Sequence, residues 1–163
     1  MIPMIISGGQ TGACRAALDV ALKFNIPHGG WIPKGRISEG SPIPDKYQLQ
    51  ELPASACPAR SALNVRWSDG TVIFSRGEPT GEIRYTRMIA LQFQKHLLHI
   101  DLNKMAAKEA ALLILTWIRF QNIKTVNVTG PSASKDGRIY ADVYRTLEIA
   151  YRMRKVERLK SGM

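Results

Sequence analysis

Residues 5–22 read IISGGQTGACRAALDVAL, which takes the chain from an apolar run through a glycine-rich bend into a helix-like pattern. The apolar start predicts a buried strand, and the spacing of Ala, Leu and Val after Gly12 predicts a helix over residues 13–24. A strand that turns directly into a helix is the first half of a βαβ unit. This stretch therefore favours a parallel sheet covered by helices.

The rest of the chain repeats this alternation. Short apolar runs, often β-branched, occur at residues 4–7, 71–74, 99–102 and 125–128, with a weaker one at 26–30. Helical patterns lie between and after them, at residues 13–24, 59–67, 83–95, 104–120 and 140–155. Right-handed crossovers then give an α/β fold, a three-layer Rossmann-like domain with a mainly parallel sheet of about five strands flanked by helices.

The length and composition indicate one domain. With 163 residues and 45% hydrophobic residues, the chain can bury a core by itself, and we expect residues 1–163 to form a single nucleotide- or oxyanion-binding domain. Residues 31–57 form a long irregular stretch whose Trp31, Ile43, Tyr47 and Leu49 favour an ordered covering loop. Residues 152–163 form a basic C-terminal tail.

The net charge of +10 raises the question of nucleic acid binding. Without residues 152–160, which hold five basic residues and one acid, the charge is +6, and no nucleic-acid-binding motif is present. This moderate charge also suits a small phosphorylated ligand, so nucleic acid is the less favoured partner. The most apolar stretch, residues 110–118, is too short to cross a membrane, and the start has no signal-peptide pattern, so we expect a cytoplasmic protein.

Metal binding is not expected. The two cysteines, Cys14 and Cys57, and the three histidines show no spacing typical of metal ligands. Cys14 follows the glycine bend, where a helix start could make a thiol reactive, but a packed side chain is the favoured alternative.

The glycine bend has the position of a phosphate-binding loop. Gly8, Gly9, Gln10, Thr11 and Gly12 follow the first strand, at the edge where open α/β sheets bind ligands and where helix N–H groups attract anions. The alternative is a tight turn without a ligand, because GGQTG matches neither the dinucleotide-binding nor the Walker A pattern.

Arg15 lies in the first turn of the predicted helix, where a cation opposes the helix dipole by about 0.3–1 kcal/mol. A bound anion would explain its presence, which makes Arg15 a candidate ligand. The alternative is a surface ladder of Arg15, Asp19 and Lys23 at helical spacing.

A second loop of this kind follows the last predicted strand. Residues 129–137 read TGPSASKDG, and in a parallel sheet they open on the same edge as the first bend. We therefore expect Ser132, Ser134 and Lys135 to close on one ligand together with Arg15.

These loops, with HGGWIPKGR (28–36), PIPDKYQLQEL (42–52), NVRWSDGTVIF (64–74) and VNVTGPSASK (126–135), resemble the putative molybdenum carrier family. That family belongs to a Rossmann-like superfamily that includes nucleotide phosphoribohydrolases of the LOG type. The resemblance implies a homo-oligomer that binds a nucleotide or molybdenum cofactor at the carboxyl edge of the sheet. Carried over by position, the binding residues are Gly8, Gly9, Gln10, Thr11, Gly12, Arg15, Lys34, Arg36, Gly130, Pro131, Ser132, Ser134 and Lys135.

The sequence departs from the family pattern in places. Cys14 replaces an aspartate, and Glu82 and Ile83 replace a glycine and a threonine of a second glycine turn. Gly81 and Thr86 remain as ligand contacts. Glu82 then points away from the ligand, pairs with Arg84 or Arg87, or indicates a different ligand. Arg60 is retained, as a ligand or as a structural contact.

The favoured function is a binding or carrier protein for a phosphorylated nucleotide- or pterin-like ligand. The alternatives are a nucleoside monophosphate phosphoribohydrolase, which hydrolyses an N-glycosidic bond, and a nucleotide-sensing domain. Hydrolysis needs a positioned acid or base, and no carboxylate spacing here identifies a catalytic pair. Asp69 is expected to belong to the turn before a strand.

Overall fold

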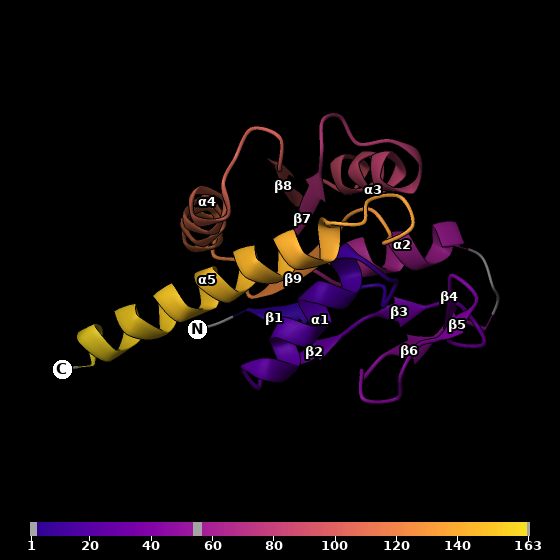
Figure 1. The fold of residues 1–163 in the computed structure, drawn as a ribbon, viewed down its shortest axis with the longest axis horizontal. Helices are drawn as coiled ribbons and strands as arrows, with labels where there is room; N and C mark the ends of the chain where they lie inside the picture. Colours follow the sequence, from indigo (N-terminus) through magenta and orange to yellow (C-terminus); the bar gives the residue numbers. More distant parts are fainter. Residues whose placement is uncertain (1–2, 54–56, 163) are drawn as a thin grey trace.

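The computed structural model describes residues 3–53 and 57–162 (Figure 1). Its main sheet has five strands, and every neighbouring pair is parallel. This confirms the predicted α/β class and the expected sheet. In spatial order the strands are β2 (His28–Gly29), β1 (Met4–Ile6), β9 (Thr125–Thr129), β7 (Gly70–Ser75) and β8 (His96–Asp101).

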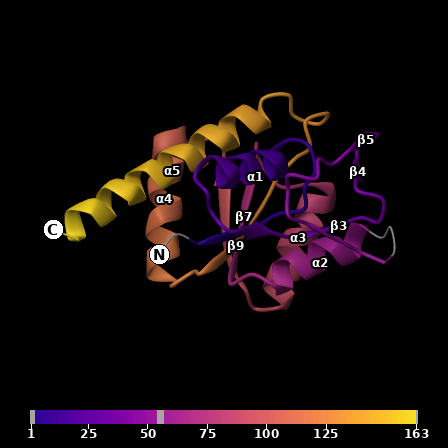
Figure 2. The ribbon, with the colours of Figure 1, turned by 90° about the horizontal axis from the view of Figure 1, so that it is seen from below.

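Helices cover both faces of the sheet (Figures 1 and 2). On one face α5 (Ile139–Ser161) packs against both α1 (Ala13–Lys23) and α4 (Ala107–Phe120). On the other face α2 (Cys57–Arg66) packs against α3 (Gly81–Gln92). The predicted three-layer arrangement is therefore present.

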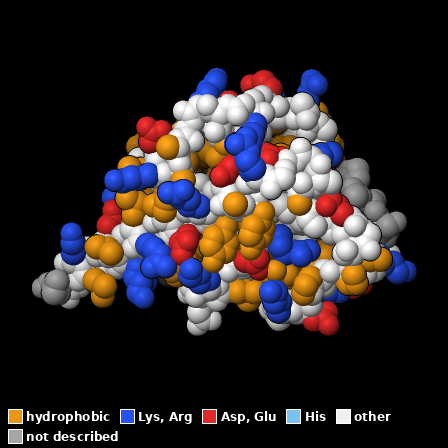
Figure 3. All heavy atoms as spheres, in the orientation of Figure 1, with side chains coloured by type: hydrophobic (Ala, Val, Ile, Leu, Met, Phe, Trp, Pro, Cys, Tyr) orange, Lys and Arg blue, Asp and Glu red, His pale blue; other side chains and the backbone are white. Residues whose placement is uncertain are grey.

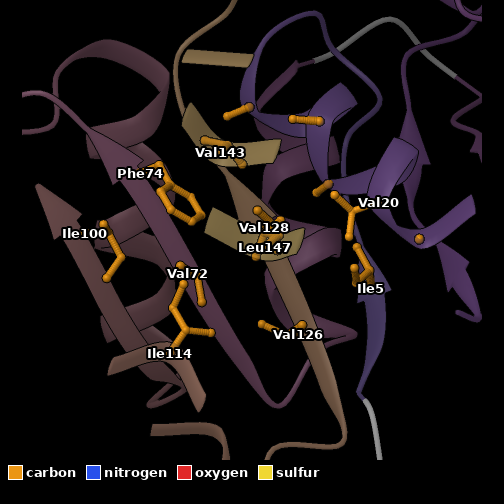
Figure 4. Close-up of a cluster of buried hydrophobic side chains, with 14 of the residues drawn as sticks. Ile5, Val20, Val72, Phe74, Ile100, Ile114, Val126, Val128, Val143 and Leu147 are labelled. Atoms are coloured by element: carbon orange, nitrogen blue, oxygen red, sulfur yellow. The ribbon is translucent and has the colours of Figure 1, made fainter. Parts of the chain in front are cut away.

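The central strands supply the core, shown in Figure 4. All six residues of β7 are buried, as expected for a strand with helices on both faces. Its Val72 and Phe74 lie in one cluster with Val128 of β9 and with Val143 and Leu147 of α5. This packing fixes the carboxyl ends of the strands, and the loops that follow them, in one place.

The segment after β2 has short strands of its own. β3 (Trp31–Ile32) pairs with β6 (Gln50–Glu51), and β4 (Ile37–Ser38) forms a hairpin with β5 (Ser41–Pro42). Ile43 and Tyr47 are only 2% exposed and pack against Leu18 of α1. We call residues 31–53 the cover segment. Residues 54–56 of the predicted covering loop lie outside the described residues.

Helix α5 continues to Ser161, so most of the residues predicted as a basic tail are helical, and Gly162 caps the helix. Its last turns project beyond the sheet in Figures 1 and 2, and Figure 3 shows apolar side chains among the basic ones there. Val156 and Leu159 are 50% and 64% exposed. Among the described residues, no helix is both long and apolar enough to cross a membrane.

A chain that ends at Lys155 tests the role of these turns. We expect it to melt within about 4 °C of the full chain, because it loses mainly exposed side chains and the exposed Arg119–Glu157 ion pair, worth about 0–1 kcal/mol. The homo-oligomer stays a prediction. If Val156 and Leu159 join copies, light scattering at equal concentration should give the shorter chain fewer subunits per particle than the full chain, and the same number of subunits would exclude that contact.

Candidate functional site

A cavity of about 780 Å³ opens at the carboxyl edge of the sheet. It lies where the chain leaves neighbouring strands for opposite faces: β9 leads to α5 on one face, and β7 leads to α3 on the other. Such switch points are the usual ligand sites of open α/β sheets. Its lining comes from the segments after β7 and β9, from Pro33 and residues 37–39 of the cover segment, and from Gln10.

The glycine bend packs against protein on three sides. A Cβ at Gly8 would lie 3.5 Å from the Arg60 side chain, and one at Gly9 would lie 2.8 Å from Leu49 of the cover segment. A Cβ at Gly12 would lie 2.4 Å from the carbonyl oxygen of Pro131. The contacts at Gly9 and Gly12 are too close for a side chain and explain the need for glycine there without any ligand, whereas 3.5 Å at Gly8 is an ordinary van der Waals distance.

The two strand-end loops touch directly, as the sequence predicts for their common edge. The N–H of Ala13 donates to the carbonyl of Pro131 at 3.2 Å, and the N–H of Ala133 donates to the Thr11 hydroxyl at 3.2 Å. The first turn of α1 thus gives one of its free N–H groups to the last loop rather than to solvent.

A carboxylate from the cover segment joins this contact. Glu39 lies between β4 and β5, and its Oε2 accepts from the Thr11 hydroxyl at 2.7 Å while its Oε1 accepts from the Ser134 hydroxyl. These bonds from Ser134 and Thr11, with a smaller contribution from Ser132, lower the pKa of Glu39 to about 2. Glu39 is therefore ionised at neutral pH.

A second carboxylate, Glu82, lies in the first turn of α3 and lines the cavity. It forms an ion pair with the buried guanidinium of Arg60 and accepts a hydrogen bond from Ser61 at 3.0 Å. With its amide oxygen toward Arg60, Gln10 accepts from both terminal nitrogens, at 2.6 and 3.0 Å. The partner of Glu82 is thus Arg60 rather than Arg84 or Arg87, whose pairing with Glu82 was one of the three alternatives that the sequence left open.

Most other charges at the cavity are paired. Arg76 contacts the carboxylates of Asp136 and Asp142, and Glu78 pairs with Arg87 at 3.1 Å. Within residues 3–53 and 57–162, no ion pair involves Lys135 or Arg138, although both line the cavity. These two cations are available for a ligand.

Lys135 approaches the start of α3. Its Nζ lies 4.0 Å from the position that a Cβ of Gly81 would take. Thr80, the N-cap residue of α3, makes no hydrogen bond to the helix through its side chain. A free ammonium beside a helix N-terminus attracts anions through both its charge and the helix dipole.

Arg15 points away from this cavity. Its Nε and terminal nitrogen donate to the carbonyl of Gly9 at 3.3 and 3.0 Å, and its guanidinium carbon lies 5.2 Å from the centre of the Tyr47 ring. Asp19 accepts from the hydroxyls of Tyr47 and Tyr140, so the alternative surface ladder with Arg15 and Lys23 is not formed either. The structure therefore does not bring Arg15 and Lys135 together.

Lys34 and Arg36, the two basic residues of the cover segment that the sequence singles out, also lie apart from the cavity lining. Arg36 donates to the carbonyls of Pro44, Tyr47 and Leu49 and so holds the segment together. Lys34 is exposed and does not belong to the residues that line the cavity.

The remaining predicted residues differ in their surroundings. Gly130, Pro131 and Ser132 line the cavity, whereas Thr86 is buried and donates to the carbonyl of Glu82 at 3.0 Å. Cys14 is only 2% exposed and contacts the Val128 carbonyl, which agrees with the packed alternative.

Sequence reasoning missed Glu39 and Arg76 as cavity residues and left Glu82 unassigned to the site. Arg76 follows β7 directly, so its position at the strand end was a usable signal. Asp69 accepts from the N–H groups of Lys124 and Thr125, which confirms its turn role.

The fold and the cavity define a Rossmann-like domain with an open cavity at the switch point of a parallel sheet. A family model described as cpYpsA, the circularly permutated YpsA SLOG family, matches residues 5–151. The chain belongs to this family.

A solved structure agrees with this assignment and with the resemblance inferred from the motifs. The crystal structure of a putative molybdenum carrier protein from Syntrophus aciditrophicus SB has 48% sequence identity to this chain and a TM-score of 0.89. The match covers 91% of this chain and 94% of that one. A comparison with curated proteins gives no match.

The contact between the loops predicts unequal costs for two glycine substitutions. Gly12→Ala should destabilise the domain by about 3 kcal/mol or more, because its φ of 86° is unfavourable for alanine and the Cβ would meet backbone atoms of the last loop. Gly35→Ala, at φ 93° with nothing within 4 Å, should cost about 1–2 kcal/mol. Chemical denaturation of both variants measures the difference, and equal costs would contradict the tight contact.

Proposed function

We propose that this chain is a binding or carrier protein for a phosphorylated ligand of nucleotide or pterin type, held in the cavity between α3 and the loop before α5. The observation that carries the proposal is the pair of cations, Lys135 and Arg138, that line this cavity without an acidic partner among the described residues. The volume of about 780 Å³ lies within the range of about 300–1,000 Å³ typical of small-molecule sites.

The phosphate has a natural place in this proposal. The start of α3 offers N–H groups that the Thr80 side chain does not satisfy, and the Lys135 ammonium lies beside them. Arg76 stands at the same strand end, but two carboxylates hold it, so it supports the loop more than it attracts an anion.

The organic part of the ligand would use the apolar side chains of the lining. Pro33, Ile37, Pro79 and Ile83 come from the cover segment and from α3 and its loop. They offer apolar surface to a planar ring while the polar loops bind the phosphate. This combination is common in nucleotide and cofactor sites.

Molybdenum cofactor is one ligand of this chemistry, since it joins a pterin ring to a phosphate. The name of the crystallised neighbour supports this choice. No group of three or more His, Cys, Asp or Glu side chains suited to a metal ion was found within residues 3–53 and 57–162. The protein would therefore hold this cargo by its phosphate and ring, and the molybdenum would serve the redox chemistry of a recipient enzyme.

Hydrolysis of a nucleoside monophosphate is the second candidate, and the position of Glu82 favours it. Its carboxylate lines the cavity and is held in place by Arg60 and Ser61. A carboxylate fixed beside a substrate can act as a general base toward water. A nucleotide sensor would use the same cavity without this reaction.

A thermal-shift panel at low salt tests these functions. The ligands are nucleoside mono- and diphosphates, NAD, molybdate, tungstate and isolated molybdenum cofactor. A ligand at 100 times its dissociation constant adds about 2.7 kcal/mol, or roughly 5–10 °C for a domain of this size. A shift with the pterin cofactor alone supports the carrier. A shift with monophosphates, followed by base release that Glu82→Gln abolishes, supports the hydrolase, and binding without release supports the sensor.

Lys135→Ala should weaken binding of a phosphorylated ligand about fivefold or more, because it removes the cation beside the start of α3. Lys124→Ala is the matched control, since it removes the same charge just before β9, at the opposite edge of the sheet. Isothermal titration calorimetry of both variants measures the effect.

Arg15→Ala tests whether the ligand also reaches the first glycine bend, because the role of Arg15 as an anion ligand stays a prediction. A ligand that lies only in the cavity should lose little affinity in this variant, because Arg15 contacts Gly9 and Tyr47 instead. A loss as large as that of Lys135→Ala would place the ligand across the first glycine bend, and no loss with Lys135→Ala would refute the cavity site.

A further inference from the structure

The carboxylate of Glu39 lies where the sequence pattern places a bound anion. The Thr11 hydroxyl comes from the loop after β1, and the Ser134 hydroxyl comes from the loop after β9. Both donate to Glu39, one to each carboxylate oxygen. The two loops that the sequence predicts to bind one ligand anion together thus both bind a carboxylate of the same chain, that of Glu39. We call Thr11, Ser132 and Ser134 the hydroxyl cradle.

The hydrogen-bond donors to the exposed carboxylate of Glu39 are neutral hydroxyl groups. No ion pair involves Glu39 in the described part of the chain, although Lys135 and Arg138 line the same cavity. Neutral hydroxyls that converge on two oxygens suit any oxyanion, and a tetrahedral one offers more acceptor oxygens than a carboxylate.

The hairpin that carries Glu39 is weakly held. Its strands β4 and β5 have two residues each, and Ile37, Gly40, Ser41 and Pro42 are exposed. Ser38 is its buried residue, and it accepts a hydrogen bond from the Thr11 N–H at 3.1 Å. Hydrogen bonds exposed to water compete poorly with a better ligand, so this hairpin can leave the cradle without disturbing the core.

The backbone at the tip is also strained. Glu39 has a φ of 49° and Gly40 one of 76°, so a non-glycine residue takes the left-handed conformation next to a glycine that favours it. This conformation costs free energy, and the hydrogen bonds from the cradle hold Glu39 in it. Release of Glu39 from the cradle frees this residue to relax.

We propose that the 37–42 hairpin is a latch whose Glu39 carboxylate occupies the hydroxyl cradle and is displaced by a tetrahedral oxyanion, either free or as the phosphate of a larger ligand. This inference rests on the proposed function for the class of ligand. It adds that Glu39 opposes binding: while it is in place it fills the cradle and sets a negative charge at the rim. Its departure would open the cradle beside Lys135 and Arg138, which line the cavity and form no ion pair within residues 3–53 and 57–162.

The test compares Glu39→Ala and Glu39→Gln with the wild type. Asp45→Asn is the matched control, because Asp45 is a fully exposed acid of the same cover segment that pairs with Arg36 and makes no contact with the cradle. The probes are inorganic phosphate, molybdate and AMP, titrated by calorimetry at low salt. Phosphate and molybdate report free oxyanions, and AMP reports a phosphate monoester.

In the wild type, only molecules with an open cradle can bind the oxyanion. Removal of the Glu39 side chain should therefore raise the affinity for the oxyanion by a factor equal to the inverse of the open fraction. We expect Glu39→Ala to bind at least one probe about fivefold or more tightly than the wild type, Glu39→Gln to change in the same direction, and Asp45→Asn to change less than twofold. Binding by Glu39→Ala alone, without binding by the wild type, would also support the latch.

Hydrogen exchange distinguishes displacement from simple charge repulsion. In the wild type, addition of the probe should speed exchange of the amides of residues 38–42, and Glu39→Ala should show this faster exchange without any probe. Slower exchange on binding would mean that the hairpin closes over the ligand and would overturn the latch.

The outcomes separate this inference from the function on which it rests. If the wild type binds a probe and Glu39→Ala binds it no more tightly, the latch is wrong and the proposed function stands. If no variant binds any probe, with the emptied cradle included, the latch is wrong, and only a shift with isolated molybdenum cofactor in the thermal-shift panel would keep the proposed function. Glu39→Gln, which keeps the shape of the side chain, serves if the alanine variant does not fold.

Discussion

The close contact between the glycine bend and the loop after β9 is the constraint on which the site depends. Gly12 takes a conformation that alanine disfavours, and the Pro131 carbonyl fills the space that a side chain would need. This brings the ends of β1 and β9 together, and with them Thr11 and the serines of the last loop. The cavity opens beside this contact, between the last loop and α3.

The charges around the cavity follow from the same arrangement. Glu82 neutralises Arg60 below the glycine bend, and Asp136 neutralises Arg76 at the end of β7. Glu39 is satisfied by hydroxyls. Among the described residues, Lys135 and Arg138 line the cavity without an ion pair, and Lys135 lies beside the start of α3. An anionic ligand that replaced Glu39 would neutralise Lys135 and Arg138, and this links the proposed function to the proposed latch.

The sequence predicted the fold well because its signals are local. Apolar runs and the glycine bend place the five strands of the main sheet within a few residues of their observed bounds, and the strand-end rule places residues 8–12 and 130–135 on one edge. The short strands β3 to β6 were not predicted, and α5 continues to Ser161, beyond its predicted end at residue 155. Contacts between distant residues could not be predicted in this way. Glu39 reaches Ser134 across 95 residues, Glu82 finds Arg60 on another helix, and Arg15 turns toward Tyr47 of the cover segment. The partners of these side chains depend on how the cover segment and α2 pack in the folded chain, and a local sequence pattern does not predict this packing.

The central claim is that the phosphate of a ligand binds between the start of α3 and the loop before α5. A nuclear magnetic resonance titration of the full chain with AMP at low salt tests it most directly, because it reports every amide at once. We expect saturable shifts concentrated at residues 77–83 and 131–138, with further changes at 38–42 and small shifts at the opposite edge near residue 124. Shifts confined to other surfaces, or no saturable shift with AMP or with isolated molybdenum cofactor, would contradict it.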